Sequence, residues 1–116
     1  MLTINEGVKI TKFTFAGLQI LFALEKMGDF VITSAEDGTH TGPDDPHHLA
    51  NAFDVRSRDI LNKEAVLLDI MNALDDGLPT ESSGGYVTKH FFGWIEVPGE
   101  PNEHYHFQLR KGMTYP

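Results

Sequence analysis

The chain has 116 residues, of which 41% are hydrophobic and 22% charged, enough for one globular domain with a single core and too few for two. Its formal net charge of −8 and its lack of any lysine- or arginine-rich run argue against nucleic acid as a partner, because nothing would neutralise the phosphates. The chain contains no cysteine, which excludes disulfides and thiolate metal sites, so any metal ion must be held by histidine, carboxylate and water.

The first expected element is a helix over residues 14–27. Thr14 can cap its N-terminus and Gly28 can end it. Its apolar residues recur at helical spacing, which predicts a buried face. The stripe consists of Phe15, Leu18, Leu21 and Phe22, widened by Ile20 and Leu24. A stripe of that width predicts a helix buried on most sides. A short strand is expected next over residues 30–34, where FVITS is rich in β-branched residues.

The segment AEDGTHTGPDDPHH is then a loop, and a loop of this length in a small domain is often functional. A strand is expected over residues 49–55, a helix over residues 59–76 that Gly77 ends, and two strands over residues 86–97 and 103–109, joined by the turn PGEPN. The apolar face of this helix comprises Ile60, Leu67, Leu68, Met71 and Leu74. The segment LPTESSGG is expected to be a polar connection. This order predicts an α+β domain with a small, mostly antiparallel sheet and two main helices.

Alternation along two of the expected strands separates an apolar face from a polar one. In LANAFDV the core-facing set is Leu49, Asn51, Phe53 and Val55, and the opposite set is Ala50, Ala52 and Asp54. In HYHFQL the core-facing set is Tyr105, Phe107 and Leu109, and the opposite set is His104, His106 and Gln108. The two alanines leave a shallow surface beside the carboxylate. If the strands are neighbours, they present metal-binding groups on one face.

The spacing of histidines and carboxylates favours a metal site. His47 stands seven residues before Asp54, and Glu103 stands three residues before His106. Two imidazoles and one carboxylate suit a tetrahedral zinc ion with one position left for water, and a nearby glutamate can act on that water as a base. A His-x-His pair taken alone is more often the solvated face of a strand, so the joint spacing carries this prediction.

The segments SAEDGTHTGPDDPHHLANAFDV and NEHYHFQL resemble the metal-site pattern of the zinc D-Ala-D-Ala metallopeptidases. This family includes D,D-carboxypeptidases, D,D-dipeptidases and phage L-alanyl-D-glutamate endopeptidases, and shares its fold with the hedgehog signalling domain. Its pattern is Ser-x-His-x2-Gly-x-Ala-x-Asp, followed downstream by Glu-x2-His or His-x-His. His47, Ala52 and Asp54 match, whereas Asp45 and Ala50 replace the family's serine and glycine. The resemblance covers residues 30–110 and implies a hedgehog-like fold, with one zinc metallopeptidase-like domain over residues 1–116.

The resemblance also implies a set of site residues. The zinc ligands are His47, Asp54 and His106. The general base is Glu103, assisted by His104, with Glu100 as the alternative base six residues before the last ligand. Catalytic relatives place an arginine upstream of the first ligand, but ITSAEDGTH contains none, so the candidates for stabilising the oxyanion are Ser34, Thr39 and His40. A register shifted by one residue, with His48 as the ligand in place of His47, is the other possibility.

The function implied by the resemblance is zinc-dependent hydrolysis of an amide bond next to a D-amino acid in peptidoglycan stem peptides. An acidic rim of Glu36, Asp37, Asp44 and Asp45 would favour a substrate with a free amine. The alternative is a non-catalytic zinc-binding module, hedgehog-like or virion-associated, which the missing arginine favours. A cupin interpretation of HYH fits poorly, because Leu109 and Arg110 stand where cupins carry a carboxylate.

The location of the protein is inferred from what its sequence lacks. No basic stretch followed by an apolar run opens the chain, and the longest apolar stretch, which contains Gln19, is shorter than a membrane span. We therefore expect neither a signal peptide nor a membrane partner. A peptidase of this kind would be cytoplasmic or phage-associated and monomeric, and it would reach the cell wall only when released.

Overall fold

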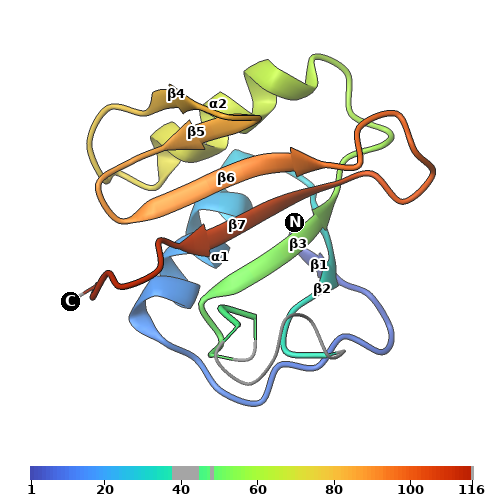
Figure 1. Ribbon diagram of the computed structural model, residues 1–116. Helices are drawn as coiled ribbons and strands as arrows, with labels where there is room; N and C mark the ends of the chain where they lie inside the picture. The colour runs from blue at the N-terminus through green and yellow to red at the C-terminus, as the bar shows by residue number, and fades with distance from the viewer. Residues whose placement is uncertain (38–44, 48, 116) are drawn as a thin grey trace.

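A seven-stranded sheet in the order β1-β2-β3-β7-β6-β5-β4 organises the computed structural model, which describes residues 1–37, 45–47 and 49–115 (Figure 1). The strands are β1 (Thr3–Ile4), β2 (Val31–Ser34), β3 (Ala52–Arg56), β4 (Thr80–Ser82), β5 (Gly85–Val87), β6 (Phe91–Glu96) and β7 (His104–Leu109). Only the β1–β2 pair is parallel; the five other pairings are antiparallel. With two helices beside this sheet, the expectation of an α+β domain with a mostly antiparallel sheet is confirmed.

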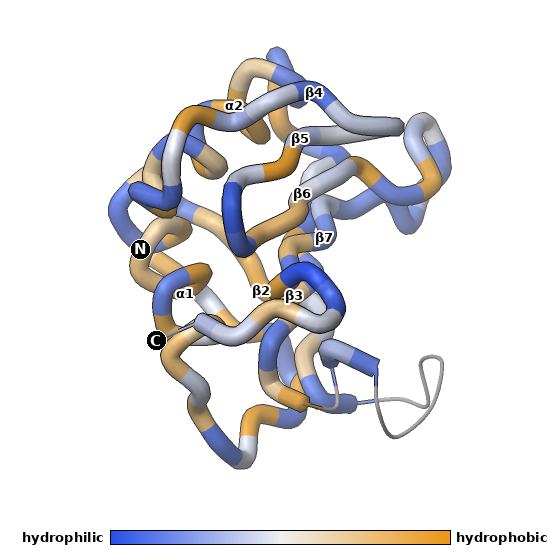
Figure 2. Tube along the Cα trace, turned by 60° about the vertical axis from the view of Figure 1, so that its left-hand side comes forward, coloured by the Kyte–Doolittle hydropathy of each residue, from blue (hydrophilic) through white to orange (hydrophobic). Residues whose placement is uncertain are grey.

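The helices α1 (Phe15–Met27) and α2 (Lys63–Ala73) lie on one side of the sheet and leave its other side open (Figure 1). The core between these layers contains buried residues of both helices and of the central strands, among them Ile20, Leu24, Phe53, Val55, Leu67, Ile70, Tyr105 and Phe107. Hydrophobic segments of α1, β2 and β3 accordingly gather in the middle of the molecule (Figure 2). In the described part of the chain no helix has the length and apolar character needed to cross a membrane.

Helix α1 begins as expected and buries Ile20 and Leu24 of the expected stripe, but not its two phenylalanines. The Thr14 hydroxyl accepts a hydrogen bond from the Gly17 N–H at 2.9 Å, so Thr14 is the N-cap. Phe15 and Phe22, however, are 71% and 63% exposed. The buried face consists of Ala16, Gly17, Ile20, Ala23 and Leu24. The prediction of a helix buried on most sides was therefore wrong, and the reason lies in close packing. A Cβ atom on Gly17 would lie 2.4 Å from the Ala50 carbonyl oxygen, so the helix approaches the chain just before β3 at Gly17.

Helix α2 is shorter than the expected helix over residues 59–76. Asn62 adopts a left-handed conformation with φ of 55°, so the preceding residues form turns. At the other end Asp75 also has a positive φ, and the helix has ended before Gly77. Leu67, Met71 and Leu74 are buried as expected, together with Ile70, whereas Ile60 and Leu68 are only half-buried.

Turn residues also change the expected strands. Residues 86–97 form two strands instead of one, because the Asp76 carboxylate accepts hydrogen bonds from Thr88 Oγ1 and His90 N, both at 2.6 Å, and fixes a turn between them. The segment LPTESSGG, expected to be a polar connection, contains β4. This strand pairs with β5 around a tight turn in which Gly84 has φ of 76°. Strand β3 starts at Ala52 and not at residue 49, since Ala50 has φ of 60°.

Candidate metal centre

Three rows of side chains lie on the open face of the sheet, because residues that pair directly across neighbouring strands share a face. The register of β3 with β7 and of β7 with β6 defines these rows. The middle row is Asp54, His106 and Trp94. The rows on either side are Arg56, His104 and Glu96, and Ala52, Gln108 and Phe92. The two strands expected to carry metal-binding groups are thus neighbours, and β6 supplies a third side of the site.

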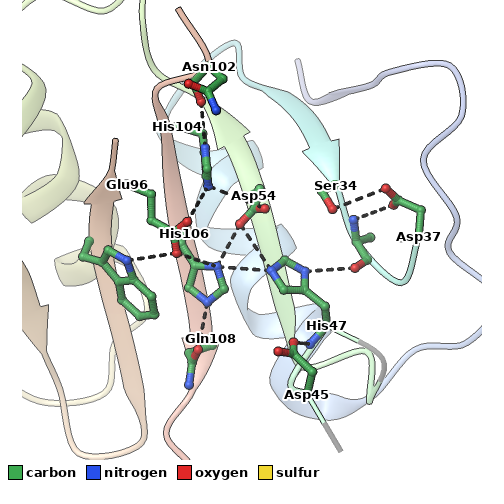
Figure 3. A network of polar contacts seen from close by, with 12 residues as sticks. Ser34, Asp37, Asp45, His47, Asp54, Glu96, Asn102, His104, His106 and Gln108 are labelled. Atoms are coloured by element: carbon green, nitrogen blue, oxygen red, sulfur yellow. Dashed lines mark hydrogen bonds and ion pairs between the residues drawn. The ribbon is translucent and has the colours of Figure 1, made fainter. Parts of the chain in front are cut away.

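His47 joins the middle row from the turn that precedes β3 (Figure 3). Its backbone N–H donates to Asp45 Oδ1 at 2.9 Å, and its carbonyl oxygen accepts from the Ala50 N–H at 3.1 Å. Its ring is buried, with Nδ1 2.9 Å from the Ala35 carbonyl oxygen at the end of β2. The turn therefore holds His47 between β2 and β3 and directs Nε2 toward Asp54 and His106.

His47, Asp54 and His106 form a compact group that could hold a metal ion. His47 Nε2 lies 3.2 Å from His106 Nδ1 and 3.3 Å from Asp54 Oδ1, and His106 Nδ1 lies 2.8 Å from the same carboxylate oxygen. Both histidines are buried and Asp54 is half-buried. These are the three residues that the sequence motifs predicted as ligands, contributed by a turn and two adjacent strands.

The second ring nitrogen of each of these histidines faces an oxygen acceptor. For His47 the acceptor is the Ala35 carbonyl; for His106 it is Gln108 Oε1, 2.8 Å from Nε2. The Gln108 amide nitrogen donates to the Leu109 carbonyl oxygen, which orients Oε1 toward His106. With a metal ion bound, ring protons at these outer positions would leave His47 Nε2 and His106 Nδ1 as electron-pair donors beside Asp54; without one, an inner nitrogen that carries a proton donates it to the Asp54 carboxylate. Such outer hydrogen bonds orient histidine ligands in metal sites.

The carboxyl group of Asp54 remains charged in this environment. Burial opposes its ionisation, but hydrogen bonds with His106 and His47 outweigh that effect and hold the pKa of the carboxyl well below its usual range. A proton on either imidazole or a metal cation can compensate this charge, and the two compete for the same nitrogen atoms. Metal affinity should therefore decrease in acid.

Glu96 is a member of the site that the sequence motifs did not identify. Its Oε2 lies 3.1 Å from His104 Nε2, and its Oε1 accepts a hydrogen bond from Trp94 Nε1 at 3.1 Å and lies 3.9 Å from His106 Nδ1. His104 Nε2 is also 3.6 Å from Asp54 Oδ2, so His104 connects the two carboxylates. Alternation in FGWIEV, which places residues 94 and 96 on one face, was the signal that could have revealed it.

Glu103 is held on the other side of β7. Its carboxylate accepts hydrogen bonds from Ser57 Oγ at 2.8 Å, Lys63 Nζ at 2.9 Å and Gly99 N at 3.0 Å. The structure thus does not bring the expected general base to the metal-binding group. Alternation explains the placement, because position 103 shares its parity with the core residue Tyr105 and not with His104. Glu100, the alternative base, is exposed in the turn before β7.

We expect the Glu103 network to stabilise the protein in a pH-dependent way. The hydrogen bond from Lys63, the Gly99 N–H and the Ser57 hydroxyl lower the pKa of Glu103 to about 2, against the opposing effect of burial. A lowered pKa stabilises the folded state above the usual glutamate pKa of about 4.3, and that stabilisation is lost as the pH falls toward 2. Glu103→Gln should therefore destabilise the protein by about 1–3 kcal/mol at neutral pH.

Urea unfolding at pH 7 and pH 3 measures this effect. The free energy of unfolding should fall less steeply with acid in Glu103→Gln than in the wild type. Glu100→Gln changes an exposed glutamate of the same turn and should behave like the wild type. Equal acid sensitivity of the wild type and Glu103→Gln would contradict the network's role.

The other expected site residues have varied positions. Thr39, His40, Asp44 and His48 lie outside the described residues. Ser34 Oγ donates to Asp37 Oδ2 at 3.3 Å, and this carboxylate also accepts from backbone N–H groups of Ala35 and Lys9. Glu36 is buried and accepts hydrogen bonds from Thr11. Glu36 and Asp37 thus hold the end of β2 against the N-terminal segment and do not form the expected acidic rim.

A cavity of about 730 Å³ opens beside the metal-binding group. Its wall includes all three potential ligands, Glu96 and Asp45, and extends past the aromatic rings of Trp94 and Phe92 to Arg110 and Lys111. The Trp94 ring lies 4.2 Å from the His106 ring, measured between centroids. The expected shallow surface over Ala50 and Ala52 is wrong, since both alanines are buried. The room for a ligand lies over β6 and β7 instead.

Comparisons with protein-family models, with curated proteins and with solved structures found no match to this chain. The hedgehog-like fold and the metallopeptidase family thus remain expectations drawn from the sequence motifs.

Proposed function

We propose that the protein is a zinc-dependent peptidase that hydrolyses an amide bond next to a D-amino acid in peptidoglycan stem peptides. The observation that carries the proposal is the convergence of His47, Asp54 and His106 at the wall of a cavity of about 730 Å³. The cavity has the size of sites that bind small molecules. The substrate class comes from the motif resemblance, whereas hydrolysis is supported by the chemistry of the grouped side chains.

The spacing of the ligand atoms supports zinc as the metal. Zinc binds nitrogen and oxygen at about 2.0–2.1 Å, so two ligands of a tetrahedral ion lie roughly 3.3 Å apart. His47 Nε2 stands at 3.2 Å from His106 Nδ1 and 3.3 Å from Asp54 Oδ1. The third pair, at 2.8 Å, would have to separate by about 0.5 Å to match. Two nitrogen ligands and one oxygen ligand leave the fourth position for water.

In this proposal Glu96 replaces Glu103 as the general base. A bound zinc ion supplies Lewis-acid chemistry, lowering the pKa of water to about 7 and polarising a carbonyl oxygen. Glu96 Oε1 takes the proton from the attacking water and returns it to the leaving amine. The Trp94 indole and His104 fix the Glu96 carboxylate by their contacts with its two oxygen atoms. Trp94 also forms, with Phe92, an aromatic wall for the substrate.

The second candidate function is a non-catalytic zinc-binding module. It is favoured by the position of Glu103, the glutamate of the motif, whose carboxylate is fully engaged with Lys63, Ser57 and Gly99. Such a module would keep the metal ligands and bind a partner without cleaving it. A catalytic assay with intact zinc content separates the two candidates.

The metal content of the purified protein tests the site. Protein purified without added metal should contain about one zinc per chain, and His47→Ala and His106→Ala should each lose most of it, because three protein ligands bind far better than two. His48→Ala is the matched control and should retain zinc. Retention in His47→Ala together with loss in His48→Ala would contradict the chosen register. Digestion of purified peptidoglycan with mass analysis of the products then tests catalysis.

A further inference from the structure

A second cavity shares no wall residue with the cavity of about 730 Å³ beside the candidate metal centre, which is called the main cavity below. It has a volume of about 340 Å³, and its wall includes Thr33, Arg56, Arg58, Asn102 and His104. His104 also contacts Glu96 at 3.1 Å and Asp54 at 3.6 Å, two residues that line the main cavity. His104 thus lines the second cavity and contacts two residues of the candidate metal centre.

Arg56 gives this second cavity an uncompensated positive charge. It is half-buried and stands in the row of His104 and Glu96, two residues along β3 from Asp54. Within the part of the chain that the structure describes, Arg56 has no ion-pair partner. The one carboxylate in the wall, Glu103, is already bound to Lys63 at 2.7 Å. In a chain of net charge −8, an arginine left without a carboxylate beside a metal-binding group indicates a place for an external anion.

The second arginine and the geometry of the row strengthen this interpretation. Arg58 uses one N–H to bind the Pro101 carbonyl oxygen at 3.2 Å and keeps its other donors. The planar fork of a guanidinium group matches a carboxylate, which it can bind through two parallel hydrogen bonds. Arg110, at the far end of the main cavity, is by contrast occupied by the carbonyl oxygens of Thr88 and Lys89.

We propose that the cavity at Arg56 is an anion subsite that binds a carboxylate of the substrate, with Arg56 as its main contact and Arg58 as the second. This proposal rests on the proposed function, because the substrate must reach the subsite from the metal centre across His104. Adjacent rows on a strand face are about 7 Å apart, which corresponds to about two residues of extended peptide. The subsite therefore selects peptides with a free carboxylate within about two residues of the cleaved amide.

A binding experiment tests the subsite without requiring hydrolysis. N-acetyl-D-alanyl-D-alanine and its C-terminal carboxamide are titrated by NMR into zinc-loaded protein carrying Glu96→Gln, which keeps the ligands intact. The acid should bind at least about tenfold more tightly than the amide, since a hydrogen bond to a charged group contributes at this level. Adding Arg56→Gln should bring the two affinities within about twofold of each other, because this change weakens the binding of the acid and not that of the amide.

Two further variants make the result decisive. Arg56→Lys keeps the charge and the aliphatic stem but loses the fork, so it should retain part of the preference even if the glutamine variant folds poorly. Arg110→Gln should leave the preference in place. A preference that is lost in Arg110→Gln and kept in Arg56→Gln would overturn the proposal, because the carboxylate would then bind at the far end of the main cavity.

The assay distinguishes failure of the subsite from failure of the proposed function. Equal binding of acid and amide to a protein whose wild type cleaves peptidoglycan peptides would refute the subsite alone. An Arg56-dependent preference for the acid in a protein that cleaves no amide would support the subsite and refute the peptidase. Zinc content should be the same in all the arginine variants, because none of them removes a metal ligand.

Discussion

Glu96→Gln should lower the rate of amide hydrolysis by about 10²–10⁴-fold, the usual contribution of a general base. The reason is geometric: Glu96 lines the main cavity and its Oε1 lies 3.9 Å from His106 Nδ1, so it could reach a water molecule beside a metal ion held by His106. Glutamine keeps the shape of the side chain and removes no metal ligand. Zinc content and thermal stability should therefore stay at wild-type values. Measurement of kcat with a D-alanyl-D-alanine peptide, together with metal analysis, checks both expectations.

Two glutamates serve as controls for this variant. Glu103→Gln should remain active at neutral pH despite its reduced stability, because its carboxylate is bound to Ser57 and Lys63 and does not line the main cavity. Glu100→Gln should be unaffected in activity and stability, as its side chain is exposed. If Glu103→Gln is inactive and Glu96→Gln is active, the general base is Glu103, as the sequence motif implied. Loss of activity in Glu100→Gln alone would instead identify Glu100, six residues before the last ligand, as the general base.

Phe53→Ala should destabilise the protein by about 3–5 kcal/mol, the usual cost of removing a buried phenylalanine ring. Phe53 is 2% exposed and belongs to the core between β3 and the helices. It lies beside Gly17 of α1, where a Cβ atom would be 3.5 Å from the Phe53 ring. The loss would be a large share of the total stability of a small domain. Thermal and urea unfolding measure it directly.

Phe22→Ala is the matched control for Phe53→Ala. It removes the same ring from α1, where the side chain is 63% exposed, so stability should change by no more than about 0.5 kcal/mol. A large loss in Phe22→Ala with a small one in Phe53→Ala would mean that the sequence-based face of α1 is the buried one after all. Zinc content should be unchanged in Phe22→Ala, which lies on the helical side of the sheet.

Much of the candidate site could be predicted because it depends on short-range patterns. Alternation in HYHFQL places His104 and His106 opposite Tyr105, and this holds in β7 because a strand turns each successive side chain to the other face. The seven-residue spacing from His47 to Asp54 likewise spans one turn and half a strand. The α+β class followed from the order of elements, since helices and strands each have their own hydrophobic period.

Contacts between segments far apart in the chain decided which strands are neighbours and which face of α1 is buried. The pairing of β3 with β7 puts Asp54 beside His106, 52 residues further along the chain, and no local pattern indicates which residues of distant segments will meet. The face of α1 was decided in the same way: apolar residues surround the helix, and Gly17 has no Cβ atom to obstruct its close approach to the chain before β3. The sequence by itself therefore determined the class of fold and indicated the three residues that could hold a metal ion. The tertiary structure alone decided which strands are neighbours and which face of α1 is buried, because the pairing of β3 with β7 and the packing of α1 depend on contacts between segments far apart in the chain.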